Sequence, residues 1–371
     1  MSPDPVRVFI LSNSLNTGGA ERFAESLLKG LDRRRARPRL VLLRDDIGYS
    51  LPRDVPVDVL GYRSAKDLPK AVLGLRRLIR KAAPHVLVGV GTSGNVVIGL
   101  ALLALKRRPA WIAGVDTNPN RRDLRLRMKL LGRLYPMADT VVACSVGMQK
   151  TLKAHFPKEK DKIECLFYPT DFETIDRAAG RNPAWTRISG GPPMLVTVGR
   201  AHRVKRWDLL LDAAAIVLKT RPVQLVFCGD GPLLEELKAK ARGMNIHNHI
   251  HFPGHCSNPF SILRQADLFL LSSDAEGLPH ALIEAQGLGL CAVSTRCEFG
   301  PDEIIGDGQT GLLVDVGNAG QMARAILALT ENASLRTRMG AKARERVRER
   351  FDFRRRCQDW EDLIVRSGTP G

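Results

Sequence analysis

Two glutamates, eight positions apart, form the most chemically informative pair in this sequence of 371 residues. They are Glu276 and Glu284, in the stretch SSDAEGLPHALIEA. Pro279 lies between them and suits the first turn of a helix, which would make Gly277 and Leu278 the N-terminal amides of that helix. Free amides at a helix start bind phosphate, and carboxylates accept hydrogen bonds from sugar hydroxyls. The combination suits a sugar nucleotide, whereas either glutamate alone would also fit a solvated surface.

Two cations follow the β-branched run Met194–Val198, which predicts a strand. Gly199 and Arg200 come directly after this run, and Lys205 lies five residues further on. Cations at the carboxyl end of a strand are placed to neutralise an anion, and arginine can do so with two parallel hydrogen bonds. Ordinary surface charge is the alternative interpretation of both residues.

A glycine pair lies between the first predicted strand, Val6–Leu11, and a helix predicted over Ala20–Leu31. Gly18 and Gly19 would let the backbone approach a ligand closely beside the helix N-terminus. The segment matches neither the G-x-G-x-x-G pattern of dinucleotide sites nor a Walker loop. A plain turn that needs two glycines explains the pair equally well.

Short apolar runs alternate with amphipathic stretches along the whole chain, which predicts an α/β protein with parallel sheets. A Gly- and Pro-containing interruption near the middle indicates two doubly wound domains in tandem, with the site in a cleft at the carboxyl ends of the strands. In the second half we expect strands at Met194–Val198, Val223–Cys228, His249–Phe252, Leu268–Leu271, Cys291–Ser294 and Gly311–Val314. The expected parts are an N-terminal domain over 1–175, a linker over 176–193, a second domain over 194–351, and a C-terminal helix over 352–371 that packs back on the first domain.

The formal net charge is +18, and most of the excess lies in the N-terminal half. A basic half favours an anionic partner, such as a membrane surface or a phosphorylated substrate. Nucleic acid is not expected, because aromatic residues make up only 5% of the chain and would supply few stacking platforms. The seven cysteines form no C-x-x-C pair and no signal-peptide pattern is present, so we expect a cytoplasmic protein. The apolar stretch 86–105 contains a polar centre, which favours a strand, a turn and a helix over a membrane span.

An ordered set of motifs resembles the family-4 retaining glycosyltransferases of the GT-B fold, in which two Rossmann-like domains face each other across a cleft. The E-x7-E spacing of Glu276 and Glu284 resembles the signature of that family. Further similar segments are Gly18-Gly19-Ala20-Glu21, Gly199-Arg200 with Lys205, ADLFLLSS (266–273), GPDEII (300–305) and DGQTGLLV (307–314). The resemblance implies transfer of a sugar from a nucleotide-diphosphate sugar to a glycan or lipid-linked acceptor, in bacterial surface polysaccharide assembly.

The resemblance also implies roles for single residues. Catalysis would rest on Glu276, which would bind the transferred sugar, and on Arg200 and Lys205, which would stabilise the departing diphosphate. Donor binding would use Glu284 at the ribose hydroxyls, the amides of Gly277 and Leu278, and the loop with Gly18 and Gly19. Family members usually work without a metal, and this chain contains no Asp-x-Asp motif, so we expect no metal and no other cofactor. Many relatives carry a histidine in the loop after the predicted strand Trp111–Val115, where this chain has Asp116 and Asn118; these two and His280 are therefore candidates for sugar or acceptor contacts.

The resemblance implies a role for the positive charge of the N-terminal half, because the N-terminal domain generally holds the acceptor in the GT-B fold. Basic residues between Arg121 and Arg133, and a second cluster from Arg33 to Arg37, predict peripheral docking on the anionic inner face of a membrane. The alternative to membrane docking is that the excess positive charge serves only to keep the protein soluble. Two rival functions stay open: a sugar-nucleotide epimerase or phosphorylase of the same fold, and a relative that binds a nucleotide sugar without turning it over.

Overall fold

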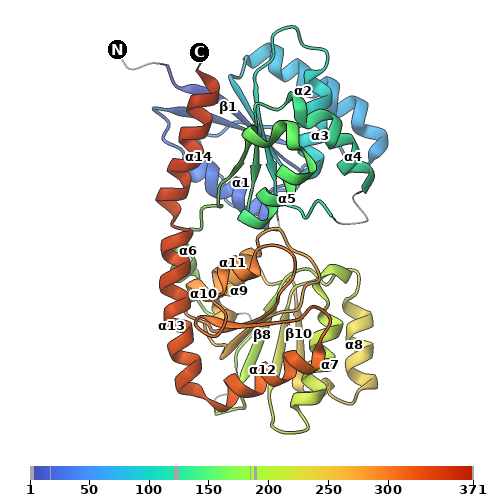
Figure 1. The fold of residues 1–371 in the computed structure, drawn as a ribbon, viewed down its shortest axis with the longest axis vertical. Coiled ribbons are helices and arrows are strands. Elements are labelled where there is room, and N and C mark those ends of the chain that lie inside the picture. Colours follow the sequence, from blue (N-terminus) through green and yellow to red (C-terminus); the bar gives the residue numbers. More distant parts are fainter. Residues whose placement is uncertain (1–3, 17, 121–124, 184, 188–189, 370–371) are drawn as a thin grey trace. The chain divides into compact units, whose positions relative to one another are not determined.

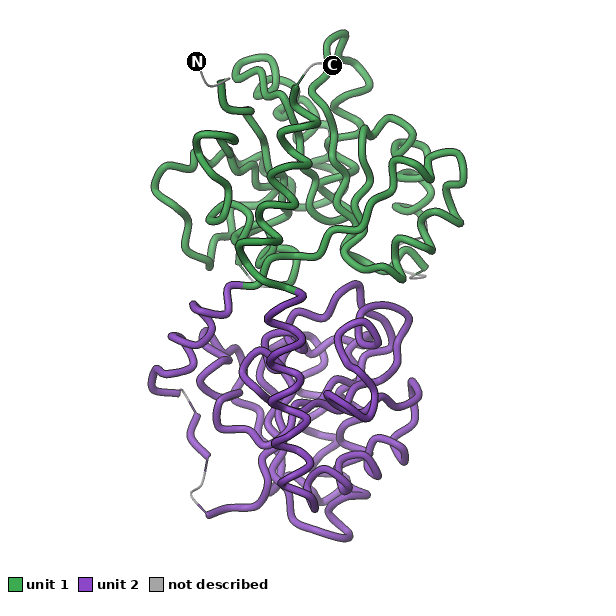
Figure 2. The backbone as a smooth tube through the Cα atoms, turned by 60° about the vertical axis from the view of Figure 1, so that its left-hand side comes forward, with its two compact units in different colours: residues 1–170, 351–371 green, residues 171–350 purple. Residues whose placement is uncertain are grey.

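The computed structural model describes residues 4–16, 18–120, 125–183, 185–187 and 190–369. The chain forms two compact units, shown in different colours in Figure 2. Unit 1 combines residues 1–170 with residues 351–371, and unit 2 comprises residues 171–350.

Unit 1 is built on a parallel sheet of seven strands in the order β3-β2-β1-β4-β5-β6-β7. The order reverses between β1 and β4, which is the topological switch point of a doubly wound sheet. The long central strands are apolar and buried on both faces, as a sheet covered by helices on both sides requires. The bounds are β1 Val6–Ser12, β2 Ala36–Leu42, β3 Val57–Val59, β4 Val86–Val90, β5 Ala110–Val115, β6 Thr140–Ala143 and β7 Ile163–Cys165.

The last helix of the chain, α14 (Phe353–Gly368), packs in unit 1 beside its first helix, α1 (Gly19–Gly30) (Figure 1). A Cβ atom on Gly30 would lie 2.1 Å from Cys357 Sγ, so the two helices approach as closely as a glycine permits. Trp360 is fully buried, and its indole donates to the carbonyl of Phe167 at 3.2 Å. The other helices of unit 1 are α2 Leu68–Ala82, α3 Gly91–Leu102, α4 Arg125–Leu134 and α5 Val146–His155.

The apolar stretch 86–105 folds as strand β4 followed by helix α3, as its polar centre predicts. In the described part of the chain, no helix combines the length and the apolar character that a membrane crossing needs.

Unit 2 contains a parallel sheet of six strands in the order β10-β9-β8-β11-β12-β13. The strands are β8 Met194–Val198, β9 Gln224–Cys228, β10 Ile250–Gly254, β11 Leu268–Leu271, β12 Ala292–Thr295 and β13 Gly311–Val314. All six match the expected strands to within two residues. The helices are α6 Phe172–Ala179, α7 Trp207–Val217, α8 Leu234–Gly243, α9 Pro259–Leu263, α10 His280–Gly287, α11 Pro301–Ile304, α12 Ala319–Glu331 and α13 Ala333–Arg350.

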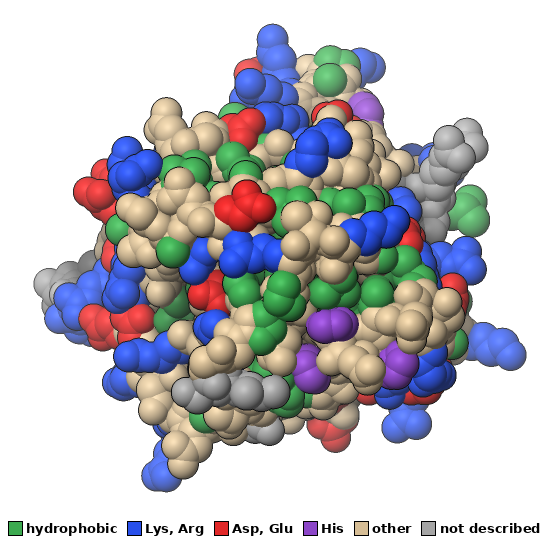
Figure 3. Space-filling view, turned by 90° about the horizontal axis from the view of Figure 1, so that it is seen from below, with side chains coloured by type: hydrophobic (Ala, Val, Ile, Leu, Met, Phe, Trp, Pro, Cys, Tyr) green, Lys and Arg blue, Asp and Glu red, His purple; other side chains and the backbone are tan. Residues whose placement is uncertain are grey.

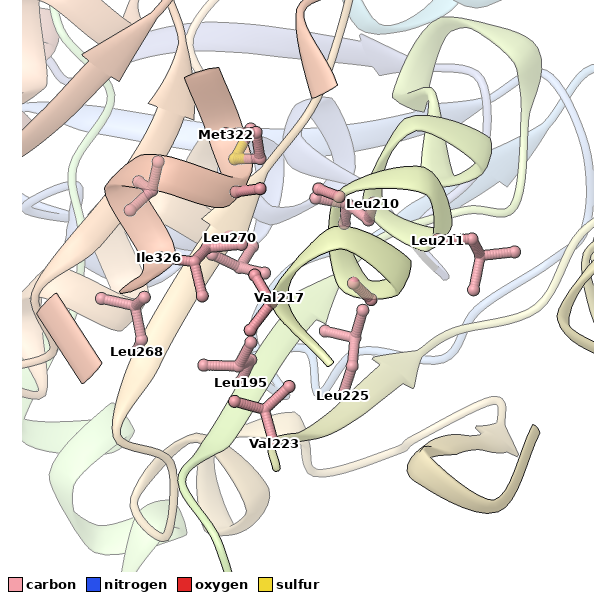
Figure 4. Close-up of a cluster of buried hydrophobic side chains, with 14 of the residues drawn as sticks. Leu195, Leu210, Leu211, Val217, Val223, Leu225, Leu268, Leu270, Met322 and Ile326 are labelled. Atoms are coloured by element: carbon pink, nitrogen blue, oxygen red, sulfur yellow. The ribbon is translucent and has the colours of Figure 1, made fainter. Parts of the chain in front are cut away.

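Aliphatic side chains from both layers fill the core of unit 2 (Figure 4). Leu195 and Leu268 from the sheet are fully buried among side chains of α7 and α12, such as Leu210 and Ile326. Burial of each such side chain contributes about 1.5–3 kcal/mol, so this core fixes the strands whose ends carry the predicted site.

The domain boundary differs from the one expected at residue 175, because the units divide between Thr170 and Asp171. Asp171 caps α6 by accepting a hydrogen bond from Thr174 N at 2.9 Å, and α6 packs on α9 and α10 of unit 2. Its apolar face, which includes Phe172 and Ile175, is buried. The helix therefore occupies the start of the expected linker, and the Gly- and Pro-rich part follows it.

Figure 3 shows one face on which lysine and arginine side chains are scattered, with aspartates and glutamates among them. The positive charge on this face is therefore distributed and forms no single continuous patch.

Candidate active site

The turn after β8 carries Arg200 and is fixed by a close approach of two backbone segments. Gly199 N donates to the carbonyl of Cys228 at 3.0 Å, which continues the ladder between β8 and β9. A Cβ atom on Gly229, whose φ is 149°, would lie 1.7 Å from the Gly199 carbonyl oxygen, so only glycine fits there. Arg200 itself is exposed and makes no ion pair with any residue that the structure describes.

Lys205 lies at the end of a short 3₁₀ helix, Arg203–Lys205, which follows this turn. Two hydrogen bonds tie the 3₁₀ helix to the loop after β11. Ser272 Oγ donates to the carbonyl of Lys205 at 2.7 Å, and Asp274 N donates to the carbonyl of Val204 at 2.8 Å. Strands β8 and β11 are neighbours in the sheet, so these two loops meet at its carboxyl edge.

The carboxylate of Glu276 accepts two short hydrogen bonds on one oxygen. Lys205 Nζ and Ser273 Oγ each lie 2.6 Å from Glu276 Oε1. The Ser273 carbonyl in turn accepts a hydrogen bond from Thr295 Oγ1 at 2.6 Å, which anchors the loop to the end of β12. The Glu276 side chain is only 10% exposed, so its position is set by these contacts.

The helix after Glu276 begins later than the sequence predicts. Pro279 is its N-cap, with ψ at 94°, and α10 starts at His280. Gly277 and Leu278 are buried in the segment before the cap, so the prediction that they supply the first helical amides is wrong. The Pro279 carbonyl accepts from Leu282 N at 3.1 Å, so the hydrogen-bond ladder of α10 begins at this cap.

Glu284 lies in the second turn of α10, as expected, and is buried with 6% exposure. His280 is half-buried at the first position of the same helix. Unit 2 therefore holds all the predicted site residues that follow β8. Among them, the side chains of Lys205 and Glu276 are in direct contact.

The remaining predicted residues lie in unit 1, at the carboxyl edge of its sheet. Gly18 is the N-cap of α1, with φ at 128°, and Gly19 is the first residue of that helix. Glu21 in the first turn accepts a hydrogen bond from Ser14 Oγ at 3.3 Å. Burial, with a smaller contribution from the nearby carboxyl of Asp116, raises the pKa of Glu21 to about 7.

Asp116 follows β5 and keeps one carboxyl oxygen without a partner among the residues that the structure describes. Its Oδ1 accepts from Thr117 Oγ1 at 3.0 Å, whereas its buried Oδ2 has no hydrogen bond to any described residue. Burial raises the pKa of the Asp116 carboxyl above its ordinary value. A Cβ atom on Gly91 would lie 3.6 Å from this Oδ2, so the glycine leaves room beside it. Asn118 is buried, and its Oδ1 accepts from Asn120 N at 2.8 Å.

Sequence reasoning missed three residues that shape these sites. The Ser273 hydroxyl donates to the Glu276 carboxylate, the Thr295 hydroxyl donates to the Ser273 carbonyl, and Glu21 is a buried carboxyl in the first turn of α1. Each follows or ends a predicted strand, or begins a predicted helix, so its place at a carboxyl edge was the available signal.

Two family models match consecutive parts of the chain. The model for group 1 glycosyl transferases matches residues 181–346, and the model for glycosyltransferase family 4 matches residues 17–173. The chain belongs to the family-4 glycosyltransferases. The two matches together contain every predicted site residue, and the chain is accordingly a glycosyltransferase.

This glycosyltransferase is 27% identical over 348 residues to an enzyme from Campylobacter jejuni, and the match covers 90% of this chain and 93% of that protein. The enzyme is named N-acetylgalactosamine-N,N'-diacetylbacillosaminyl-diphospho-undecaprenol 4-alpha-N-acetylgalactosaminyltransferase. Among solved structures it resembles HepE from Anabaena in complex with UDP, with a TM-score of 0.79, 17% identity, and coverage of 97% of this chain and 100% of that one. It also resembles sucrose-phosphate synthase from Thermosynechococcus elongatus, with a TM-score of 0.82, 17% identity and coverage of 97% and 98%. These likenesses confirm the predicted GT-B fold of two Rossmann-like domains.

Proposed function

We propose that this glycosyltransferase is a retaining enzyme that moves a hexosyl unit from a nucleotide-diphosphate sugar to a glycan or lipid-linked acceptor in bacterial surface polysaccharide assembly. The observation that carries the proposal is the contact of 2.6 Å between Lys205 Nζ and Glu276 Oε1. It places a cation and a carboxylate at the carboxyl edge of one sheet, where open α/β sheets bind their ligands.

The charges at this edge suit a departing diphosphate. An ammonium group has three N–H donors, and the contact with Glu276 uses one of them, so Lys205 can still donate to phosphate oxygens. Arg200 at the end of the neighbouring turn is exposed and can add a bidentate contact. Negative charge grows on the diphosphate as the glycosidic bond breaks, and fixed cations stabilise that charge more than they stabilise the ground state. We therefore propose that no divalent ion is required.

The carboxylates would hold the donor by its hydroxyls. Glu276 stands beside Lys205 and would accept from hydroxyls of the transferred sugar, while Glu284 on α10 would accept from the ribose. The amides of Gly277 and Leu278, in the segment before the cap, and the amide of Ala281, in the first turn of α10, would donate to the diphosphate in this proposal. Retention of the anomeric configuration would follow from attack on the same face that the phosphate leaves, with the phosphate taking the acceptor proton.

The reported relatives support the choice of substrates. The Anabaena structure contains UDP, so a uridine nucleotide is the first donor to test. The name of the Campylobacter jejuni enzyme specifies an acceptor sugar linked through a diphosphate to undecaprenol. An acceptor of that kind carries both a sugar hydroxyl and an anionic lipid anchor.

Residues of unit 1 would contact a sugar or the acceptor. Asp116 has a buried oxygen that lacks a described partner, and Asn118 lies two residues further along the same loop. Gly18 and Gly19 at the start of α1 provide the close backbone approach that a phosphorylated ligand needs. His280 of unit 2 stays a candidate for a sugar contact.

Helix α4 favours peripheral binding to an anionic membrane. Leu126 is 83% exposed at its start, and Arg127, Lys129 and Arg133 are exposed around it. Each basic residue near an anionic bilayer contributes about 1 kcal/mol. Residues 121–124 of the predicted basic run lie outside the described residues.

The second basic cluster contributes less than the sequence suggests. Arg33 pairs with Asp54, and Arg34 pairs with Asp32. Arg35 pairs with both Glu361 and Asp362. These three charges are compensated within unit 1, so α4 is the better candidate for a lipid contact.

The donor is tested by thermal-shift screening against nucleotide-diphosphate sugars, since a ligand that binds the folded chain stabilises it by mass action. Transfer is then followed with the best donor and a lipid-linked acceptor, and the anomeric configuration of the product is read by NMR. An inverted product would overturn the retaining mechanism. A donor that is epimerised or phosphorolysed without acceptor would restore the rival functions, which the glycosyltransferase family models do not favour. Donor binding without turnover would restore the non-catalytic rival.

Membrane binding is tested by co-sedimentation with neutral and anionic vesicles at low salt. We expect binding to anionic vesicles only, and loss of most of it in Arg127→Glu/Lys129→Glu. The matched control is Lys219→Glu/Arg242→Glu, which changes two exposed charges in unit 2. Equal binding to both kinds of vesicle, or equal loss in the two variants, contradicts docking through α4.

A further inference from the structure

Two thiols of unit 2 lie in direct contact, although 28 positions separate them in the sequence. Cys228 Sγ and Cys256 Sγ are 3.1 Å apart. Cys228 is the last residue of β9, and Cys256 lies two residues after the end of β10. Since β9 and β10 are neighbours in the sheet, the pair stands at the same carboxyl edge as Arg200 and Lys205.

The environments of the two thiols differ in a way that suits sequential reaction. Cys228 is 1% exposed, whereas Cys256 is half-buried. The hydrogen bond from Cys228 lowers the pKa of Cys256, and the same contact together with burial raises the pKa of Cys228. By contrast, burial raises the pKa of Cys291 and of Cys297 to about 12. A reactive cysteine needs access, and Cys256 is the more accessible of the two thiols.

We propose that Cys228 and Cys256 form a reactive dithiol that closes into a disulfide by exchange with a small-molecule disulfide. Cys256 is the attacking thiol and Cys228 the resolving one. An accessible thiol beside a buried partner is the arrangement found in redox-sensitive cysteine pairs.

The reaction balances as two exchanges. The Cys256 thiolate attacks one sulfur of the small disulfide, the S–S bond of that reagent breaks, and one thiolate leaves and takes up the proton that Cys256 released. Cys228 then attacks Cys256 Sγ in the mixed disulfide, and its proton leaves with the second small thiol. Two electrons pass from the protein to the reagent, which is released as two thiols.

The pair is coupled to the turn that carries Arg200 through the backbone. The carbonyl of Cys228 accepts from Gly199 N at 3.0 Å, and Gly229 N donates to the carbonyl of Gly254 at 2.9 Å. Cys256 Sγ also lies 3.4 Å from that Gly254 carbonyl. A disulfide requires the two sulfurs to approach to about 2.0 Å, so its formation would move the segment after β10 against the end of β9. This coupling rests on the proposed function, since it predicts weaker binding of the nucleotide in the oxidised protein.

The experiment exposes the full-length chain to graded ratios of glutathione disulfide to glutathione, blocks free thiols by alkylation and maps the peptides by mass spectrometry. We expect a single Cys228–Cys256 disulfide and the loss of two of the seven thiols. Cys256→Ser should abolish the loss, Cys228→Ser should stop at a mixed disulfide on Cys256, and Cys165→Ser, which changes a half-buried thiol in unit 1, should oxidise like the wild type. Retention of both thiols at every ratio, or a different pair of oxidised cysteines, overturns the proposal.

Calorimetric titration of reduced and oxidised protein with UDP separates this proposal from the proposed function. A fall in UDP affinity of threefold or more in the oxidised form supports the coupling, and equal affinities in the two forms overturn it. If the disulfide forms but UDP and the other nucleoside diphosphates bind neither form, the nucleotide donor is wrong and the dithiol stands. If UDP binds but no disulfide forms, the dithiol is wrong and the donor stands.

Discussion

Lys205 and Glu276 are 71 positions apart in the sequence, yet their side chains meet at 2.6 Å. The contact exists because Lys205 follows β8, Glu276 follows β11, and these two strands are parallel neighbours. Ser272 and Ser273 reinforce it from the loop after β11 by bonding to the Lys205 backbone and to the Glu276 carboxylate. The ammonium group of Lys205 and the carboxylate of Glu276 are therefore held in fixed positions. Fixed charges of this kind are what stabilisation of a developing charge requires.

Replacement of this lysine is expected to remove transfer without unfolding the chain. Lys205→Ala should lower kcat by about 100- to 1,000-fold, since one preorganised donor at a developing charge contributes about that factor. Glu276→Ala should also abolish measurable transfer, because the sugar loses its carboxylate partner. The measurement is the initial rate of product formation, with circular dichroism as the check on folding.

Lys238→Ala provides the matched control for the lysine variant. Lys238 also pairs with a glutamate, Glu235, but on the surface of α8. Its activity should stay within a factor of two of the wild type. If Lys205→Ala and Glu276→Ala turn over normally, the site assignment is wrong.

Arg200 is expected to act on the donor rather than on stability. Arg200→Ala should weaken nucleotide-diphosphate binding by about tenfold, and Arg200→Lys should recover only part of the loss because lysine cannot bind two phosphate oxygens in parallel. The unfolding free energy should change by less than about 0.5 kcal/mol, since the side chain is exposed. Calorimetric titration and urea unfolding measure the two quantities. Arg203→Ala, which alters an exposed neighbour, should leave both unchanged; an equal loss of affinity in Arg203→Ala would point to general surface charge instead.

The strands of unit 2 could be predicted from the sequence because each is a short apolar run that ends at a polar or glycine-containing turn. Strand β8 has the bounds that the sequence predicts, Met194–Val198, and Arg200 and Lys205 follow it in the next turn. Helix α10 begins at His280, one residue after the proline that the sequence places in its first turn. These strands are buried along most of their length, so the residues that form the apolar pattern are also the residues that form the core. The pattern therefore predicts where the strands lie.

The features that could not be predicted depend on contacts between distant segments. Strand β3 is a three-residue edge strand, and its two valines are exposed, so they mark no face of the core. Proline fits both the N-cap and the first turn of a helix, so the sequence alone did not show that Pro279 lies outside α10. The hydroxyls of Ser273 and Thr295 acquire their role only when β11 and β12 pair.

Removal of divalent ions is expected to leave activity intact. If Lys205 and Arg200 supply the positive charge at the diphosphate, excess EDTA should change kcat by less than twofold, and added Mg²⁺ should not raise it. The measurement is the transfer rate after dialysis against chelator, with a control in which Mg²⁺ is restored. A loss of tenfold or more that Mg²⁺ reverses would show that a metal acts in the reaction.

The C-terminal helix is expected to be essential for the stability of unit 1. Trp360 is fully buried, packs 4.7 Å from the ring of Phe23, and donates to Phe167. Trp360→Ala should therefore lower the free energy of unfolding by about 3–5 kcal/mol, as large-to-small core substitutions do. Urea unfolding measures the change. Gln358→Ala on the exposed face of the same helix should cost less than about 0.5 kcal/mol, and a similar cost for both variants would mean that α14 contributes little packing.

Glu21 is expected to make stability depend on pH near neutrality. Its pKa is about 7 in the folded chain against an ordinary 4.5, so between these values the folded chain keeps a proton that the unfolded chain releases. The stabilisation is fully present below pH 4.5 and is lost as the pH rises through 7. From pH 5 to pH 8 the free energy of unfolding of the wild type should fall by up to about 3 kcal/mol relative to Glu21→Gln, which has no proton to lose. Urea unfolding at several pH values measures this difference, and the variant Glu173→Gln, at an exposed glutamate, should follow the wild-type curve. Parallel curves for the wild type and Glu21→Gln would show that burial does not shift the Glu21 carboxyl.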